Sequence, residues 1–464
     1  MKKVILIAFY FNQVNEIASK RLRALAKYLP EFGYEAIVIV PDLGPVPNEN
    51  DNLNCRIITT EYEDMFAHLF KKFKADSKDK GDLNNDFNES EINNDSQKLK
   101  DSSSVSNPIA SKAISFAGEI FAYPDGMKYW YAPAFEEISK IIEEEDIYAI
   151  ISSSWPITCH TIAKDISYKY NIPWIADLRD LWNLNPYVSH TFIRDYFEMR
   201  LEKRTFENTD VLTTTTALAA ETLSTIHPDN KIVPVLSGYD EDDFKFLDSI
   251  LNEKEKSNGS LETDSSLDSD GDLANQNDKK LKFIYAGSLY GGKRDPTILF
   301  NAIRQLEDES KMDSSKLSIE FYGDSGNLEE IAEEYSLSSV VKIGGKIPHE
   351  EVLKKQLNSD VLLLISWNNE KEKMFIPGKI YEYFALRKPV LSIGYKEGSL
   401  KDLIEETNVG YHVSDLESTK EVLLTIYNEF LDSGKVDFNS EINIDDYSMV
   451  AMASKFADLL DDLS

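Results

Sequence analysis

The chain has 464 residues, 42% of them hydrophobic and 28% charged, a length and balance typical of two globular domains with full cores. Its formal net charge of -31 excludes the basic footprint of a nucleic-acid-binding protein and disfavours broad adsorption to anionic lipid, although a local basic patch remains compatible with it. Only two cysteines are present, Cys55 and Cys159, which favours a reducing cytoplasm, and no apolar run approaches the ~20 residues that span a bilayer.

The first elements predict a Rossmann-like opening. An apolar run at 4–9 indicates a buried strand, an amphipathic pattern at 19–29 a helix, and a second apolar run at 35–40 the next strand. This βαβ order is typical of a parallel sheet. The GxGxxG motif of dinucleotide-binding enzymes is missing, so no nicotinamide cofactor is expected. Arg21 begins the helix, where it could meet a ligand phosphate or be a solvated surface charge.

Two segments have low complexity. Residues 75–106 are rich in Asp, Asn, Ser and Lys and carry scarcely any large apolar side chain, so the sequence predicts a disordered insertion there. Residues 253–280 form a second insertion of this kind. Its aspartates imitate part of a calcium loop, but the glycine is misplaced and the closing glutamate is missing. We therefore expect no metal site.

A strand predicted at 148–151 ends in a run of serines that closes with Ser154. The helix after it carries His160. Rossmann-like folds place ligands at the carboxyl ends of parallel strands, so both side chains are candidates for a site. A lone histidine on a helix is more often a structural residue, and this alternative stays open.

The strand predicted at 174–176 ends in the run DLRDLW. In this run Asp177 and Asp180 flank Arg179. Two carboxylates around one arginine often form a network that satisfies itself. The same set can orient a substrate or supply a general base. The sequence alone leaves both interpretations open.

A helix predicted at 192–208 carries several arginines and lysines. These are compatible with a contact to anionic lipid or to a lipid phosphate. Glutamates interleave with them at Glu198, Glu202 and Glu207, which favours a solvated face laced with salt bridges.

The second domain is predicted to open with a strand at 283–287 and a glycine-rich loop, GSLYGGKRD, before a helix at 296–306. The two glycines in the loop, at 291 and 292, would let the backbone approach a diphosphate. Lys293 and Arg294 would supply positive charge. A pair of glycines is a weak signal alone, and its place after the first strand of the domain strengthens it.

The run MFIPGKIYEYFALRKPVLSIG, at 374–394, is predicted to be a loop, a helix and a strand that follow the buried strand at 361–365. Pro377 suits the first turn of the helix, whose N-terminus is a natural seat for a phosphate. Lys379 adds a cation there. Glu382 lies one turn further, where a carboxylate could bind sugar hydroxyls. An ordinary helix N-terminus, with Glu382 paired to Lys379, is the alternative.

Three runs, RLRALAKYLPEFG, DLRDLW and PGKIYEYFALRKPV, resemble motifs of GT-B glycosyltransferases of the family 4-like, group 1 type. The resemblance covers almost the whole chain apart from the two insertions. It implies an α/β protein in which two Rossmann-like domains face each other across a cleft and a C-terminal helix crosses back. The implied parts are an acceptor-side domain at 1–240, a linker at 241–280, a nucleotide-sugar-binding domain at 281–445 and the crossing helix at 446–464.

The resemblance also implies roles for single residues. Arg294 and Lys379 would stabilise the leaving diphosphate, Glu382 would bind the ribose, and the backbone at Ile347 would hold the base. The donor-binding set is Gly287, Ser288, Lys293, Arg294, Ile347, Pro377, Gly378, Lys379 and Glu382. The acceptor-side set is Asn15, Arg21, Ser154, His160, Arg179 and Asp180, and Asp177 joins Arg294 and Lys379 as catalytic. The chain departs from the pattern at Ser288, where the family has arginine, and at Met374, where it has the first of two glutamates.

The implied activity is transfer of a sugar from a nucleotide-diphosphate sugar to a glycan or lipid-linked acceptor in surface polysaccharide assembly. The family is retaining and needs neither metal nor cofactor. We expect a cytoplasmic protein with a candidate peripheral contact at the inner face of the membrane. Two alternatives remain, a nucleotide-sugar 2-epimerase of GT-B fold and an inactive partner subunit, the latter motivated by the departures at Ser288 and Met374.

Overall fold

The computed structural model describes residues 1–13, 17–44, 53–64, 123–188, 191–245, 279–437 and 444–463. The predicted insertion at 75–106, most of that at 253–280 and the candidate residue Asn15 lie outside these ranges. The chain forms two compact units. The N-terminal unit comprises Met1–Thr213, Ser224–Ile232 and Ala457–Ser464, and the C-terminal unit comprises Thr214–Leu223 and Val233–Phe456.

A seven-stranded sheet forms the centre of the N-terminal unit, with strand order β3-β2-β1-β4-β5-β6-β7. The strands are β1 (Lys2–Ile7), β2 (Tyr34–Pro41), β3 (Arg56–Thr60), β4 (Ala149–Ser153), β5 (Trp174–Leu178), β6 (Val211–Thr214) and β7 (Ile232–Pro234). From β3 to β5 neighbouring strands run parallel. The order reverses between β1 and β4, so a ligand site is expected at the carboxyl ends of the strands near this point.

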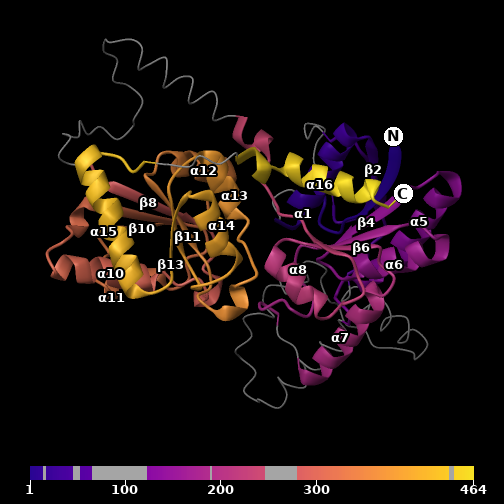
Figure 1. The fold of residues 1–464 in the computed structure, drawn as a ribbon, viewed down its shortest axis with the longest axis horizontal. Coiled ribbons are helices and arrows are strands. Elements are labelled where there is room, and N and C mark those ends of the chain that lie inside the picture. The colour runs from indigo at the N-terminus through magenta and orange to yellow at the C-terminus, as the bar shows by residue number, and fades with distance from the viewer. Residues whose placement is uncertain are drawn as a thin grey trace, which may run out of the picture. The chain divides into compact units, whose positions relative to one another are not determined.

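Helices connect these strands (Figure 1). They are α1 (Ile17–Tyr28), α5 (Tyr131–Glu144), α6 (Thr158–Tyr170), α7 (Phe192–Phe206) and α8 (Ala217–Ser224), of which α8 belongs to the C-terminal unit except for its last residue. Most turn apolar side chains toward the unit's core, as α5 does with Ala134, Ile138 and Ile141. Asn171, in the left-handed region at a φ of 54°, ends α6. The side chain of Thr191 caps α7.

A six-stranded sheet forms the centre of the C-terminal unit, with order β10-β9-β8-β11-β12-β13. Every neighbouring pair runs parallel. The strands are β8 (Leu281–Ala286), β9 (Leu317–Tyr322), β10 (Val341–Gly345), β11 (Val361–Ile365), β12 (Val390–Ile393) and β13 (Gly410–Val413). All five residues of β11, VLLLI, are buried, as expected for a strand with helices on both faces.

The C-terminal unit contributes α10 (Thr297–Asp308), α11 (Leu328–Glu334), α12 (His349–Leu357), α13 (Lys379–Leu386), α14 (Ser399–Thr407), α15 (Leu416–Ser433) and α16 (Met449–Asp461). Two separate apolar clusters form its core. One holds side chains of α10 and α15, which lie side by side in Figure 1, and the other holds side chains of α13 and α14. The end of α16 belongs to the N-terminal unit, where the Tyr148 hydroxyl donates to the Leu460 carbonyl at 2.8 Å.

The predicted α/β class with two Rossmann-like sheets is confirmed. The strand predicted at 361–365 has the bounds of β11. Several elements were not predicted, among them β3, α14, β13 and α15. All described helices are too short or too polar to cross a membrane.

Candidate functional site

The glycine-rich loop after β8 makes a tight left-handed turn. Tyr290, Gly291 and Gly292 have φ values of 48°, 61° and 86°. The turn closes on itself, because the backbone N–H of Arg294 donates to the carbonyl of Leu289 at 3.1 Å. The loop thereby places Lys293 and Arg294 just before α10, at the carboxyl end of the sheet.

Lys379, the first residue of α13, reaches the end of β8. A Cβ atom built on Gly287 would lie 2.8 Å from the Lys379 Nζ and 3.3 Å from the Tyr285 hydroxyl. The ammonium group therefore rests over the backbone of Gly287, in space that only a residue without a side chain leaves open. The sequence placed both residues in a donor site, and the structure brings them into contact.

Arg294 meets the same tyrosine. Burial raises the pKa of Tyr285, and the charge of Arg294 together with a hydrogen bond from it lowers that pKa. The Arg294 guanidinium also stacks on the Tyr290 ring, with its Cζ 4.3 Å from the ring centroid. Tyr285 is thus a common neighbour of Arg294 and Lys379, and the two predicted cations converge at one strand end.

Lys293 contacts an aromatic residue that sequence reasoning missed. Its Nζ lies 4.6 Å from the ring centroid of Trp367, which follows β11. The signal available in the sequence was a tryptophan two residues after a buried strand of a parallel sheet.

The predicted nucleoside residues also come together. The Glu382 carboxylate lies 3.8 Å from Nε2 of His349, and its side chain is 19% exposed. His349 begins α12, two residues after Ile347. No hydrogen bond of the Ile347 backbone is found among the described parts of the chain. The loop predicted to hold a base therefore adjoins the carboxylate predicted to hold a ribose. His349 was not predicted, because nothing in the sequence links it to Glu382.

The loop before α13 is buried at its start and exposed where it meets the helix. Met374 is buried, and its carbonyl accepts a hydrogen bond of 2.7 Å from the Thr216 hydroxyl. Pro377 is half-buried, whereas Gly378 is exposed and no atom would lie within 4 Å of a Cβ built there. A ligand could approach the first turn of α13 closely at that point.

In the N-terminal unit, Asp177 is the centre of a buried network. Arg21 donates to both of its carboxylate oxygens, at 2.9 and 3.1 Å. The hydroxyls of Ser153 and Thr213 each donate to it at 2.8 Å. Asp177 has no exposed surface and Arg21 only 3%. Four donors satisfy this carboxylate, which fits a role in positioning the strand ends more closely than contact with a substrate.

Ser154, Arg179 and Asp180 form a second cluster at the ends of β4 and β5. The Ser154 hydroxyl donates to the Asp180 carbonyl at 2.7 Å, and Nε of Arg179 donates to the Ser154 carbonyl at 2.6 Å. Nη2 of Arg179 lies 3.0 Å from the Asp180 carboxylate, whose side chain is 40% exposed. This cluster, unlike Asp177, has a carboxylate open to a ligand.

His160 lies in an aromatic core. Its side chain has no exposed surface, and its Nδ1 is 2.8 Å from the Ser152 hydroxyl, which also accepts from the Trp174 indole. Its ring packs edge-on against Phe206. Burial lowers the pKa of His160 to about 3, so the imidazole is neutral at neutral pH. This placement fits the alternative that His160 is a structural residue. A side chain with no exposed surface does not support the predicted contact with an acceptor.

Comparison with known proteins gives structural matches only. No family model and no curated protein matches the sequence. Sucrose-phosphate synthase from Thermosynechococcus elongatus is 13% identical with a TM-score of 0.58, over 100% of this chain and 99% of that one. HepE from Anabaena, in complex with UDP and glucose, is 12% identical with a TM-score of 0.57, over 100% of both chains. The lipopolysaccharide outer core galactosyltransferase WaaB is 10% identical with a TM-score of 0.52, over 100% of both.

These proteins resemble this chain along their whole length, and the parallel sheets with interleaved helices described above correspond to their two Rossmann-like domains. The chain therefore has the GT-B fold.

Proposed function

We propose that the protein is a glycosyltransferase that moves a sugar from a nucleotide-diphosphate sugar to a hydroxyl group of an acceptor. The observation that carries the proposal is the convergence of Lys379 and Arg294 on Tyr285, at the end of β8. Two cations at the carboxyl edge of a Rossmann-like sheet, beside the N-terminus of α13, suit a pyrophosphate. The complex of HepE with UDP and glucose supports a UDP-sugar as the donor.

The proposed donor pose follows from the order of these groups. The diphosphate would lie against Gly287, Ser288 and the two cations, with Lys293 adding charge from the edge of the loop. The ribose hydroxyls would bind Glu382, next to His349. The base would contact the backbone of Ile347.

We further propose a retaining reaction. The bond between the anomeric carbon and the β-phosphate oxygen breaks, and the acceptor hydroxyl oxygen bonds to that carbon on the same face of the ring. The acceptor proton passes to the leaving β-phosphate oxygen, which gives a glycoside and a nucleoside diphosphate. Arg294 and Lys379 would stabilise the negative charge that grows on the leaving group, the part that a metal ion plays in other transferases.

For the acceptor we propose a glycan or a lipid-linked glycan of surface polysaccharide assembly, used at the inner face of the membrane. Arg179 and the half-exposed Asp180 are the proposed contacts, with Asp177 and Arg21 in a supporting position.

The test is product formation from a panel of UDP-sugars with the full chain. Wild type should release UDP in the presence of an accepted donor, and Lys379→Ala should lower the rate at least ~100-fold, the range for loss of one transition-state donor. Glu382→Ala should raise the KM for the donor more than it lowers kcat. Equal, background-level release by wild type and both variants would support an inactive protein, and an epimerised sugar without transfer would support the epimerase.

A further inference from the structure

Helix α7 has its polar and apolar faces reversed relative to an ordinary surface helix. Its buried residues include Arg194, Glu198 and Glu202. Four of its large apolar side chains are exposed instead: Phe192 is 87% exposed, Ile193 58%, Tyr196 58% and Phe197 51%. A helix that packs on a core normally buries such side chains and leaves charges outside.

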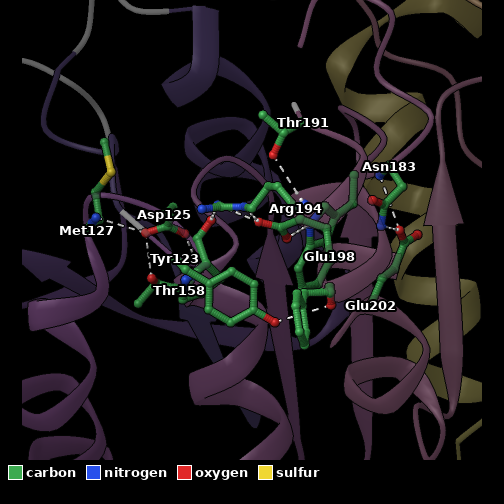
Figure 2. A network of polar contacts seen from close by, with 12 residues as sticks. Tyr123, Asp125, Met127, Thr158, Asn183, Thr191, Arg194, Glu198 and Glu202 are labelled. Carbon is green, nitrogen blue, oxygen red and sulfur yellow. Dashed lines mark hydrogen bonds and ion pairs between the residues drawn. The ribbon is translucent and has the colours of Figure 1, made fainter. Parts of the chain in front are cut away.

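The buried charges of α7 are satisfied inside the N-terminal unit. Arg194 pairs with Glu198 and donates to the Pro124 carbonyl at 2.8 Å. The Trp182 indole donates to Glu198 at 2.7 Å. Figure 2 shows Arg194 pointing toward Glu198 within this network.

Glu202 is held in the same way, one turn further along. Asn183 donates to it from its backbone and its side chain (Figure 2). Nε2 of His227 lies 3.3 Å from the Glu202 carboxylate. The glutamates that the sequence placed among the basic residues of a solvated face are therefore turned inward. The predicted solvated face is wrong for Glu198 and Glu202, because both carboxylates are buried, while Glu198 does form an ion pair, with Arg194.

The outer side of α7 continues from apolar to basic. After Phe192, Ile193, Tyr196 and Phe197, the next two turns expose Arg200, Lys203 and Arg204 at the same helical angles. None of these three forms an ion pair with a carboxylate among the described residues. The exposed acids of α7 and its end are Asp195, in the first turn, and Glu207, after the last residue.

We propose that this outer face, the α7 face, docks the protein on an anionic membrane surface. Its apolar turns would enter the boundary between headgroups and acyl chains, while Arg200, Lys203 and Arg204 would meet anionic headgroups. Like charge disfavours a second copy docked through the same face, because two α7 faces in contact would bring their basic side chains Arg200, Lys203 and Arg204 together. Anionic headgroups would instead pair with these three side chains.

The α7 face is independent of the proposed transfer reaction, since it needs neither donor nor acceptor. The test is sedimentation of the full chain with vesicles of phosphatidylcholine alone and of phosphatidylcholine with phosphatidylglycerol, without nucleotide. Wild type should bind the anionic vesicles more tightly, and added salt should weaken this binding. The double variant Arg200→Gln/Lys203→Gln should bind about 25-fold more weakly, at about fivefold for each charge. Phe192→Ser should cost about tenfold.

Two matched controls separate the α7 face from general effects. Tyr168→Ser removes another aromatic side chain, 84% exposed on α6, and Lys342→Gln/Lys396→Gln removes two exposed positive charges from the C-terminal unit. Both should bind like wild type, and all variants should melt like it, because the changed side chains are exposed. The proposal is overturned if wild type fails to sediment with anionic vesicles, or if the controls lose binding equally. Self-association that Phe192→Ser abolishes, without vesicle binding, would instead identify the α7 face as a protein interface.

Discussion

At the residue scale, the proposed donor site depends on the positions of a few side-chain atoms. Lys379 can lie over the end of β8 only because Gly287 has no Cβ, and Arg294 reaches the same place through Tyr285. Tyr383 supports this arrangement from behind: its buried hydroxyl donates to the Leu363 carbonyl at 3.0 Å and ties α13 to β11. Burial raises its pKa well above the ordinary value, so this donor stays protonated. The site depends on the position of one ammonium group.

We therefore predict that Gly287→Ala weakens nucleotide binding. The new methyl group would lie 2.8 Å from the Lys379 Nζ, so the side chain must swing away, and a φ of 157° also disfavours alanine. The affinity for UDP, measured by calorimetry, should fall about tenfold, as for loss of one charged contact. Gly126→Ala adds the same methyl group where no atom lies within 4 Å and should bind like wild type. Equal affinities of wild type and Gly287→Ala for UDP would contradict the proposed position of the Lys379 ammonium group over Gly287.

The buried imidazole of His160 predicts a loss of stability in acid. Its pKa is lowered by burial from 6.5 to about 3, so below pH 6.5 the unfolded chain takes up a proton that the folded chain refuses. The free energy of unfolding should then fall by up to about 1.4 kcal/mol for each pH unit between 6.5 and 3. Urea unfolding at pH 7 and pH 5 measures this slope. His160→Asn, which cannot titrate, should give a shallower slope than wild type, and identical slopes would show that the group does not contribute.

At the scale of elements, buried polar contacts fix how helices meet the N-terminal sheet. The pair between Arg21 of α1 and Asp177 of β5 joins residues 156 positions apart, with both side chains almost fully buried. Such a pair contributes little net stability when intact, but removing one partner leaves an uncompensated charge.

Arg21→Met should accordingly lower the free energy of unfolding by about 3–5 kcal/mol, because Asp177 stays buried without its cation. Arg56→Met, which breaks the half-exposed pair with Glu145, should cost less than ~1 kcal/mol and serves as the control. Urea titrations of the three proteins compare these costs. A cost for Arg21→Met no larger than that for Arg56→Met would mean that the buried pair is not a structural anchor.

Elements built on continuous apolar runs were predictable from the sequence. The bounds of β11 match because its five residues, VLLLI, form one apolar run that is buried throughout. By contrast, β13 has the run GYHV, of which only Val413 is buried, so no apolar run marks it. In α7 the spacing predicted a helix correctly but not its orientation, because burial of Glu198 and Glu202 depends on partners far away in the sequence.

On the scale of the whole molecule, two parallel sheets and their helices give the GT-B fold, and the carboxyl end of each sheet carries a polar cluster. The candidate site was partly predictable. Lys379, Arg294 and Glu382 stand in motifs, whereas His349 and Trp367 join them only through folding. The pairing of Asp177 with Arg21, rather than with Arg179, likewise follows from the packing of α1 and could not be read from the run DLRDLW.

The central claim is that Lys379 and Arg294 bind the diphosphate of a nucleotide sugar, and calorimetric titration of UDP into the full chain tests it most directly. We predict that wild type binds UDP and that Lys379→Ala and Arg294→Ala each weaken binding by about tenfold or more. Lys373→Ala, in the loop before α13 and paired with Glu370, should bind like wild type. Binding of UDP with equal affinity by wild type, Lys379→Ala and Arg294→Ala would contradict the account.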